Sequence, residues 1–337
     1  MEFLEKIYER ARKTKKKILL SEPHDERVLK AIESILKSGI CVPILIGDPE
    51  EANGVAKKQG IDLKGLEIID NTRSKDLDKY IELYCEKRKH KKISSEEALK
   101  IITGNPVFYA SLMVSAGDAD GSVAGASTTT RDVAKAAIYC IGSAENIKTV
   151  SSSTLLILDD KALGSNGIFI YADAGIVPDP SPEELADIAI SSARMANILL
   201  DDQPKIAMLS YSTKGSGGFG SSIQKVQEAT RIVREREPGL LIDGEIQVDY
   251  AVAPEVAKKK DPDSRIKGRA NIFIFPNLDA GNISYKLTQR LGKARAIGPL
   301  LQGLQRPASD LSRGCDYQDI IDAVAITAVR AQGEDIQ

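Results

Sequence analysis

Short apolar runs alternate with amphipathic helix patterns along almost the whole chain of 337 residues. This alternation predicts an α/β protein, with sheets that are largely parallel and are flanked by helices. The chain is long enough for two domains of ordinary size. The strand candidates are Lys17–Ser21, Val42–Ile46, Leu66–Ile69, Ser122–Ala124, Leu155–Leu158, Ile168–Tyr171, Ile206–Ser210, Leu240–Ile242, Ile272–Phe275 and Ala294–Gly298.

Two of the helix patterns begin with a readable cap. Ser94 is followed three residues later by Glu97, which predicts a capping box. Ser181 is followed by Pro182 at the first helical position and by Glu184. The chain has no internal repeat and no low-complexity linker. Breaks near 142–148 and 300–303 predict a first domain of residues 1–146 plus 301–337, closed by the C-terminal helix, and a second of residues 147–300.

Composition excludes several classes of function. The formal net charge is −2 at pH 7, which gives no basic surface for nucleic acid or membrane. The cysteines Cys41, Cys85, Cys140 and Cys315 lie far apart, so neither a disulfide framework nor a zinc site is expected. The N-terminal segment is charged and amphipathic, so we expect no signal peptide and a cytoplasmic protein. With only two histidines, a histidine triad or a multi-histidine metal site has little to draw on.

The segment from Pro307 to Asp319 predicts an anion site. Ser312 and Arg313 are adjacent, Gly314 follows, and an apolar helix pattern begins soon after Asp319. Helix N-termini attract anions because their first amides lack internal partners, and an arginine there can grip a phosphate or carboxylate through two N–H groups. Asp316 and Asp319 could belong to this site, or they could only complement the helix dipole, as carboxylates in a first helical turn often do.

A glycine-rich segment, Gly215–Gly220, fits the pattern G-x-G-x-x-G after a strand pattern, and Asp243 comes later. This pattern suggests a dinucleotide site and hence an NAD-dependent dehydrogenase. Four residues separate the strand pattern from the first glycine, however, which is unusual for that fingerprint. The segment better suits a polar loop that approaches a phosphorylated ligand through its backbone amides.

Two further turns rich in glycine and hydroxyl groups follow strand candidates, one at 125–131 and one at 277–282. Ligands of parallel α/β sheets gather beyond the carboxyl ends of the strands, so turns that converge on one cleft would bind an extended anion. The plainer alternative for each turn is an ordinary helix cap. The candidate contacts in these turns and in the loop after Leu209 are Ser127, Thr128, Thr129, Arg131, Ser212, Lys214, Gly215 and Asn282.

Six blocks resemble the phosphate acetyl/butyryltransferase family, in collinear order over essentially the whole chain. They are 25–28, 117–121, 209–216, 243–247, 275–282 and 310–315. The resemblance implies two α/β domains with the active site in the cleft between them, and a homodimer. It also implies transfer of an acetyl group between coenzyme A and phosphate, with acetyl phosphate, phosphate and coenzyme A as substrates. No metal and no tightly bound cofactor is expected.

The family's functional residues map onto this sequence. Asp319 would be the general base that takes the thiol proton of coenzyme A. Arg313 would hold the acyl phosphate and stabilise the developing charge, and Ser312 would hydrogen-bond an oxygen of the substrate. Arg290 and Arg88 match arginines that bind substrate or coenzyme. Cys315 is expected to be a bystander, because the family reaction is a direct transfer.

Two positions depart from the family pattern, Thr128, where a histidine is common, and Lys135. Lys135 stands where an arginine is usual, and lysine keeps the charge but loses the two-pronged geometry. Arg131, four residues earlier, could partly compensate. Three alternatives remain open from sequence: a butyryl- or propionyltransferase, an NAD-dependent dehydrogenase, and a non-catalytic binding module. Retention of Ser312, Arg313 and Asp319 argues against the last.

Overall fold

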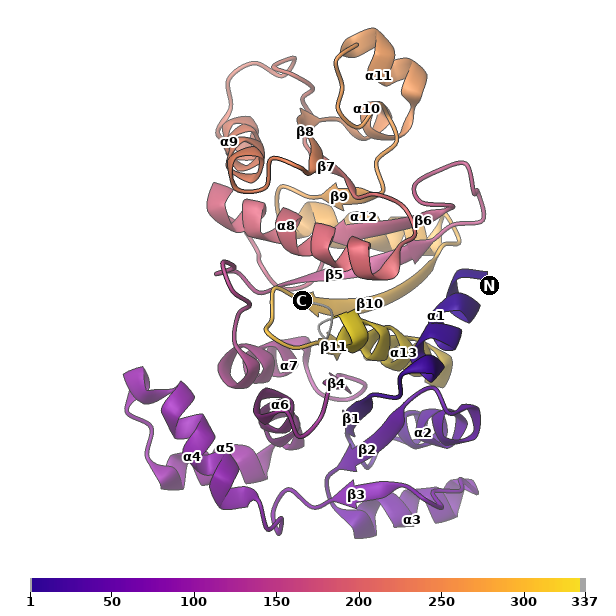
Figure 1. The fold of residues 1–337 in the computed structure, drawn as a ribbon, viewed down its shortest axis with the longest axis vertical. Helices are drawn as coiled ribbons and strands as arrows, with labels where there is room; N and C mark the ends of the chain where they lie inside the picture. The colour runs from indigo at the N-terminus through magenta and orange to yellow at the C-terminus, as the bar shows by residue number, and fades with distance from the viewer. Residues whose placement is uncertain (1, 334–337) are drawn as a thin grey trace. The chain divides into compact units, whose positions relative to one another are not determined.

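A computed structural model describes residues 2–333 and divides the chain into two compact units. The first unit is Met1–Ala144 together with Leu304–Gln337, and the second is Glu145–Gly303. Figure 1 labels the helices and strands of both. No helix among the described residues is long and apolar enough to cross a membrane.

The first unit is built on a sheet with the order β3-β2-β1-β4-β11. Every pairing within it is parallel. The strands are β1 (Lys17–Ser21), β2 (Val42–Ile46), β3 (Glu67–Ile69), β4 (Gly121–Ala124) and β11 (Ala308–Asp310). Ile18, Leu19 and Leu20 in the central strand β1 are almost completely buried, because helices cover both faces. This arrangement confirms the predicted parallel sheet.

Figure 1 shows α6 on one side of β1, β2 and β4, with α2 and α13 on the other side. The helices of this unit are α1 (Glu2–Lys13), α2 (Glu26–Ser38), α3 (Pro49–Gln59), α4 (Leu77–Lys87), α5 (Ser95–Gly104), α6 (Pro106–Ala116), α7 (Thr130–Ala136) and α13 (Tyr317–Gly333), with the short turns η1 (Lys89–Lys91) and η2 (Ala137–Ile141). The predicted capping box at Ser94 and Glu97 is present at the start of α5.

The second unit contains strands in the order β10-β5-β6-β9-β7-β8. β5 pairs antiparallel with both neighbours, and the remaining pairings are parallel. The strands are β5 (Ser151–Ile157), β6 (Ile168–Ala172), β7 (Lys205–Leu209), β8 (Leu241–Ile246), β9 (Ile272–Ile274) and β10 (Arg295–Gln302). The sheet is therefore mainly parallel with antiparallel pairings at one side.

Helices α8 (Pro182–Leu199) and α9 (Ser221–Arg236) pack on one face of that sheet. Helices α10 (Val248–Val252), α11 (Pro254–Lys260) and α12 (Leu278–Arg290) complete the unit. The aromatic rings of Phe169, Tyr171, Phe273 and Phe275 contact one another in its core. The predicted Ser181 capping box and Pro182 begin α8.

All the strand candidates from the sequence coincide with strands of the structure, with shifts at some ends. One strand was missed. β11 has only three residues, two of which are Ser309 and Asp310, so no apolar run marks it. β8 continues past the predicted Ile242 because Asp243 and Glu245 are buried with polar partners.

Candidate active site

The carboxyl ends of β1, β4 and β11 meet at one edge of the parallel sheet of the first unit. Glu22, in the turn after β1, is buried and adopts a positive φ of 87°. Its carboxylate accepts backbone N–H groups from the turn after β4, namely those of Gly125, Ala126, Ser127 and Thr128. A carboxylate thus fills the row of amides that the sequence offered to a ligand, and fixes the shape of the turn.

Gly125 allows this turn to lie against β11. Its φ is +112°, and a Cβ atom placed on it would clash with Oδ1 of Asp310 and would lie 2.7 Å from the nitrogen of Leu311. Any side chain at position 125 would therefore push the two turns apart.

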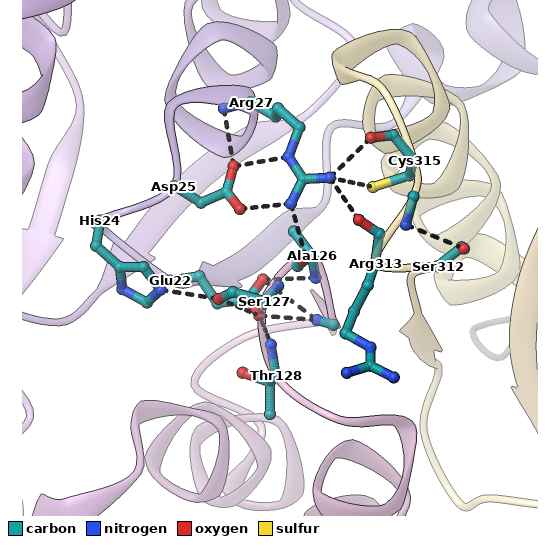
Figure 2. A network of polar contacts seen from close by, with 12 residues as sticks. Glu22, His24, Asp25, Arg27, Ala126, Ser127, Thr128, Ser312, Arg313 and Cys315 are labelled. Atoms are coloured by element: carbon teal, nitrogen blue, oxygen red, sulfur yellow. Dashed lines mark hydrogen bonds and ion pairs between the residues drawn. The ribbon is translucent and has the colours of Figure 1, made fainter.

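Arg27, at the start of α2, ties three turns together (Figure 2). Its Nη1 donates to the carbonyl oxygens of Arg313 at 2.8 Å and Cys315 at 2.9 Å. Its Nη2 donates to the carbonyl oxygen of Ala126 at 2.7 Å. Asp25 accepts from Nε at 3.0 Å and from Nη2 at 2.7 Å. The planar guanidinium therefore holds the backbone of the 313–315 segment against the turns after β1 and β4.

The pair of Asp25 and Arg27 stays charged. Burial by itself would raise the pKa of Asp25, but the hydrogen bonds from Arg27 outweigh burial and hold this pKa below its ordinary value. Asp25 also caps α2, because its carboxylate accepts the backbone N–H of Arg27 at 2.9 Å.

The guanidinium of Arg313 points away from the contacts that Arg27 makes with the backbone of residues 313–315 (Figure 2). Figure 2 shows the carbonyl group of Arg313 turned toward Arg27 and its side chain extending in another direction. Ser312 and Arg313 are both exposed. Among residues 2–333, no hydrogen bond or ion pair engages the Arg313 guanidinium. A fixed backbone thus carries a cation that is available to an anionic ligand.

Asp316 and Asp319 form a reciprocal cap at the start of α13. Oδ1 of Asp316 accepts the backbone N–H of Asp319 at 2.9 Å, and Oδ2 of Asp319 accepts the backbone N–H of Asp316 at 3.1 Å. This is the geometry of a capping box, with aspartates in both positions. Each carboxylate is therefore held by the backbone amide of the other residue.

Cys315 is buried beside Arg27, whose Nη1 lies 3.9 Å from its Sγ. Burial raises the pKa of the Cys315 thiol to about 11, and Asp319 adds to the rise, while Arg27 opposes it. A thiol with this pKa is almost entirely protonated near neutral pH, which makes it a poor nucleophile.

Two further cationic side chains of the first unit, Arg88 and Lys135, lie near the ring of Tyr139 in η2. The guanidinium carbon of Arg88 lies 3.7 Å from the ring centroid, and Nζ of Lys135 lies 5.8 Å from it. The ring thus brings together two predicted ligand contacts that are distant in sequence. Arg131 is exposed one turn before Lys135 on α7. Thr129 caps this helix by accepting the N–H of Asp132.

The turn 125–128 also borders a cavity of about 350 Å³, whose wall includes His24 and Thr128. His24 contacts the hydroxyl of Ser127 at 2.8 Å. The other charged side chains of the wall are Glu22, Asp48, Glu50, Glu51, Asp70 and Arg73. Because carboxylates dominate this wall, the cavity is a poor site for a phosphorylated ligand.

The glycine-rich loop of the second unit is occupied by its own side chains. Ser212 is fully buried and donates to the carboxylate of Glu245, which also accepts the N–H of Gly215 at 2.7 Å. The N–H of Gly217 is bound to the hydroxyl of Ser212. These amides are therefore engaged within the loop and do not form the phosphate-binding row expected from the sequence.

Lys214 forms ion pairs with Asp243 at 3.5 Å and Asp261 at 3.3 Å. Asp243 is buried and also accepts from Ser264. The acidic residue that a dinucleotide site would direct at a ribose is thus enclosed in the protein, which removes the main support for an NAD site.

The two remaining predicted contacts lie on α12. Asn282 donates its side-chain amide to the carbonyl oxygen of Ala174 at 3.0 Å, which is a structural role. Arg290, at the end of the helix, is exposed and makes no ion pair with the described residues.

Sequence reasoning did not assign Glu22, Arg27 or Asp310 to the site. Arg27 lay in a block that carried the family resemblance, but nothing in its spacing indicated contacts with residues 313 and 315. No cluster of three or more histidine, cysteine or carboxylate side chains that could hold a metal is found in the described residues.

The family model described as "Phosphate acetyl/butaryl transferase" matches residues 2–328. The chain belongs to this family. A phosphate acetyltransferase of Acetivibrio thermocellus is 46% identical over 332 residues, which cover 98% of this chain and 99% of that protein. Another, from Thermoanaerobacterium thermosaccharolyticum, is 45% identical and is covered completely. A solved phosphotransacetylase from Streptococcus pyogenes matches with a TM-score of 0.91 and 39% identity, over 98% of each chain.

Proposed function

We propose that this enzyme transfers an acetyl group reversibly between coenzyme A and phosphate. Membership of the family sets the class of enzyme, an acyltransferase. The single observation that carries the proposal is the exposed guanidinium of Arg313, whose backbone is fixed by Arg27 directly before the N-terminus of α13. Such a preorganised cation suits a reaction in which phosphate is held and then released with negative charge.

The reaction begins with the thiol of coenzyme A. Asp319 accepts the thiol proton, and the thiolate attacks the carbonyl carbon of acetyl phosphate. A carbon–sulfur bond forms, and the tetrahedral species then breaks its bond to the phosphate oxygen, which leaves with the electron pair. Arg313 neutralises the phosphate, and Ser312 donates a hydrogen bond to a substrate oxygen. To take this proton, Asp319 must itself be ionised.

No protein thiol takes part in this scheme. The raised pKa of Cys315 agrees with direct transfer between the two substrates. The reaction therefore needs both substrates bound together, and no acyl-enzyme is formed.

The phosphates of coenzyme A would be bound by the cations around Tyr139, namely Arg88 and Lys135, with Arg131 nearby on α7. Arg290 is a further contact, and the exposed residues Ser127 and Thr129 lie on the turn that leads into α7. Ser212, Lys214, Gly215 and Asn282 would act indirectly, by shaping the loops of the second unit. Placement of coenzyme A in a cleft between the domains stays a prediction.

A coupled assay tests the proposal. Coenzyme A is mixed with acetyl phosphate, and thioester formation is followed by its absorbance. Butyryl phosphate and propionyl phosphate serve as parallel substrates, and NAD with a hydroxy-acid substrate as a separate arm. Preferential turnover of acetyl phosphate supports the proposal. Preference for a longer acyl chain would assign the alternative transferase, and NAD reduction alone would refute acyl transfer.

We also propose a cytoplasmic homodimer. All four cysteines are free in the described part of the chain, as is usual in a reducing compartment.

On and just after α12, Ile283, Leu287 and Leu291 are spaced by four residues and are 56%, 51% and 77% exposed, respectively. Such an aliphatic stripe suits a two-fold contact with a second copy. Light scattering should report a dimer that Leu287→Lys weakens; a parent monomer would refute it.

A further inference from the structure

Asp310 is a buried acidic residue that the proposed mechanism does not use. It ends β11, two residues before Ser312, and its relative exposure is 0%. The hydroxyl of Thr130 donates to its Oδ2 at 2.6 Å. Its other oxygen, Oδ1, has no hydrogen-bond partner among residues 2–333. An ionised carboxylate with one bare buried oxygen would be costly, whereas a protonated carboxyl group is tolerated.

Among residues 2–333, the charged group that acts on Asp310 is another acid. Glu22, in the turn after β1, is the charged group that faces it. From α13, Thr327 contacts the hydroxyl of Ser309, and Arg330 donates to the carbonyl oxygen of Ala308. Burial chiefly, with a smaller contribution from Glu22, raises the pKa of Asp310 to about 7, against the opposing hydrogen bond from Thr130.

We propose that Asp310 is a positioning residue that works in its protonated form and holds the Ser312–Arg313 segment against the N-terminus of α7. Thr130 is the first residue of α7, which also carries Arg131 and Lys135. The bond between Thr130 and Asp310 therefore joins the loop proposed to bind acyl phosphate to the helix proposed to bind coenzyme A. Gly125 leaves the room that the Asp310 carboxyl group occupies. The inference rests on the roles proposed above for Arg313 and Lys135.

The experiment compares turnover number and Michaelis constant for coenzyme A across about pH 6 to pH 9, a range that spans the titration of such a group. The variants are Asp310→Asn, which cannot ionise but still accepts from Thr130, and Asp310→Ala, which removes the link. Thr130→Val deletes the donor, and Thr130→Ser restores it. Ser309→Ala is the matched control, because Ser309 is a buried polar residue of the same strand that bonds to α13 instead.

We expect Asp310→Ala and Thr130→Val to lower turnover by about tenfold or more at the acidic end, since small displacements of a site are costly. Thr130→Ser and Ser309→Ala should behave as the parent does. The turnover of Asp310→Asn relative to the parent should rise with pH, by about threefold or more, as the parent loses its proton. If Asp310→Ala does not fold, the Asn and Thr130 variants suffice.

Parent-like turnover in Thr130→Val, or a relative turnover of Asp310→Asn that stays flat or falls with pH, overturns the inference. The control for the underlying assignment is Arg313→Ala. If Arg313→Ala is inactive while the Asp310 and Thr130 variants match the parent, only this inference fails. If Arg313→Ala is fully active, the proposed mechanism is refuted, and the inference that rests on it is refuted with it.

Discussion

Asp316 and Asp319 hold each other at the start of α13, each carboxylate accepting the backbone N–H of the other residue at 2.9 and 3.1 Å. This reciprocal bond fixes the direction in which the Asp319 side chain leaves the helix. It also means that either residue can be changed to asparagine without loss of the acceptor that makes the cap. The two asparagine variants are therefore a matched pair for testing which carboxylate takes the thiol proton.

We predict that Asp319→Asn lowers turnover by about a hundredfold or more, the usual scale for loss of a general base. Asp316→Asn should lower it only slightly. Steady-state kinetics with acetyl phosphate and coenzyme A, together with melting temperatures, check this pair. Equal losses in both variants with unchanged stability would show that the cap, rather than the base, is what turnover needs.

Arg313→Ala should reduce turnover by about a hundredfold or more, equivalent to roughly 3 kcal/mol of transition-state stabilisation, because a preorganised charge is lost. Stability should change little, since Arg313 is exposed and only its backbone carbonyl is bound by Arg27. Chemical denaturation measured alongside the kinetics separates these effects. A folded variant with the parent's turnover number would remove Arg313 from the mechanism.

Cys315→Ala should remain active within about threefold of the parent, because the high pKa of this buried thiol leaves little thiolate to react. Mass spectrometry of the parent mixed with acetyl phosphate should find no acetylated Cys315. Trapping of an acetylated Cys315 that forms and decays at the catalytic rate would establish covalent catalysis instead.

Lys135→Arg should tighten binding of a phosphate-bearing substrate by a few-fold, since a planar fork replaces a point charge. The neighbouring Tyr139 ring can stack on a second guanidinium as it does on Arg88. Michaelis constants for coenzyme A and acetyl phosphate measure the effect, and Arg131→Lys provides a comparison on the same helix. A raised Michaelis constant for both substrates would mean that the site is fitted to lysine.

Asp310 should make the folded state less stable as pH rises. Its folded pKa of about 7 exceeds the ordinary value of 3.8, so the folded protein binds this proton more tightly than the unfolded chain does. The stabilisation is complete below about pH 4 and is lost as pH rises through about 7, with a maximum of about 4 kcal/mol. Between pH 5 and pH 8, the free energy of unfolding should fall more for the parent than for Asp310→Asn. Parallel curves for the two proteins would contradict the assigned proton.

The fold class followed from local patterns in the sequence. Strands such as Lys17–Ser21 and Val42–Ile46 are covered by helices on both faces, so their sequences are nearly continuous apolar runs. Caps such as Ser94 with Glu97 are local as well, because donor and acceptor lie three residues apart. The sequence also pointed to Ser312, Arg313 and Asp319, which lie within eight residues of one another.

What the sequence could not determine were contacts between segments brought together only by the parallel sheet. Arg27 bonds to carbonyl groups 286 and 288 residues away, and Glu22 fills amides more than a hundred residues away. Nearly every residue carries a backbone carbonyl and amide, so no sequence motif can indicate which of them a side chain will bind. The same holds for Asp310, whose raised pKa depends on burial and on Glu22. Helix caps and buried strands were therefore predictable from spacing, whereas the amides bound by Glu22, the backbone contacts of Arg27 and the raised pKa of Asp310 arose only from packing.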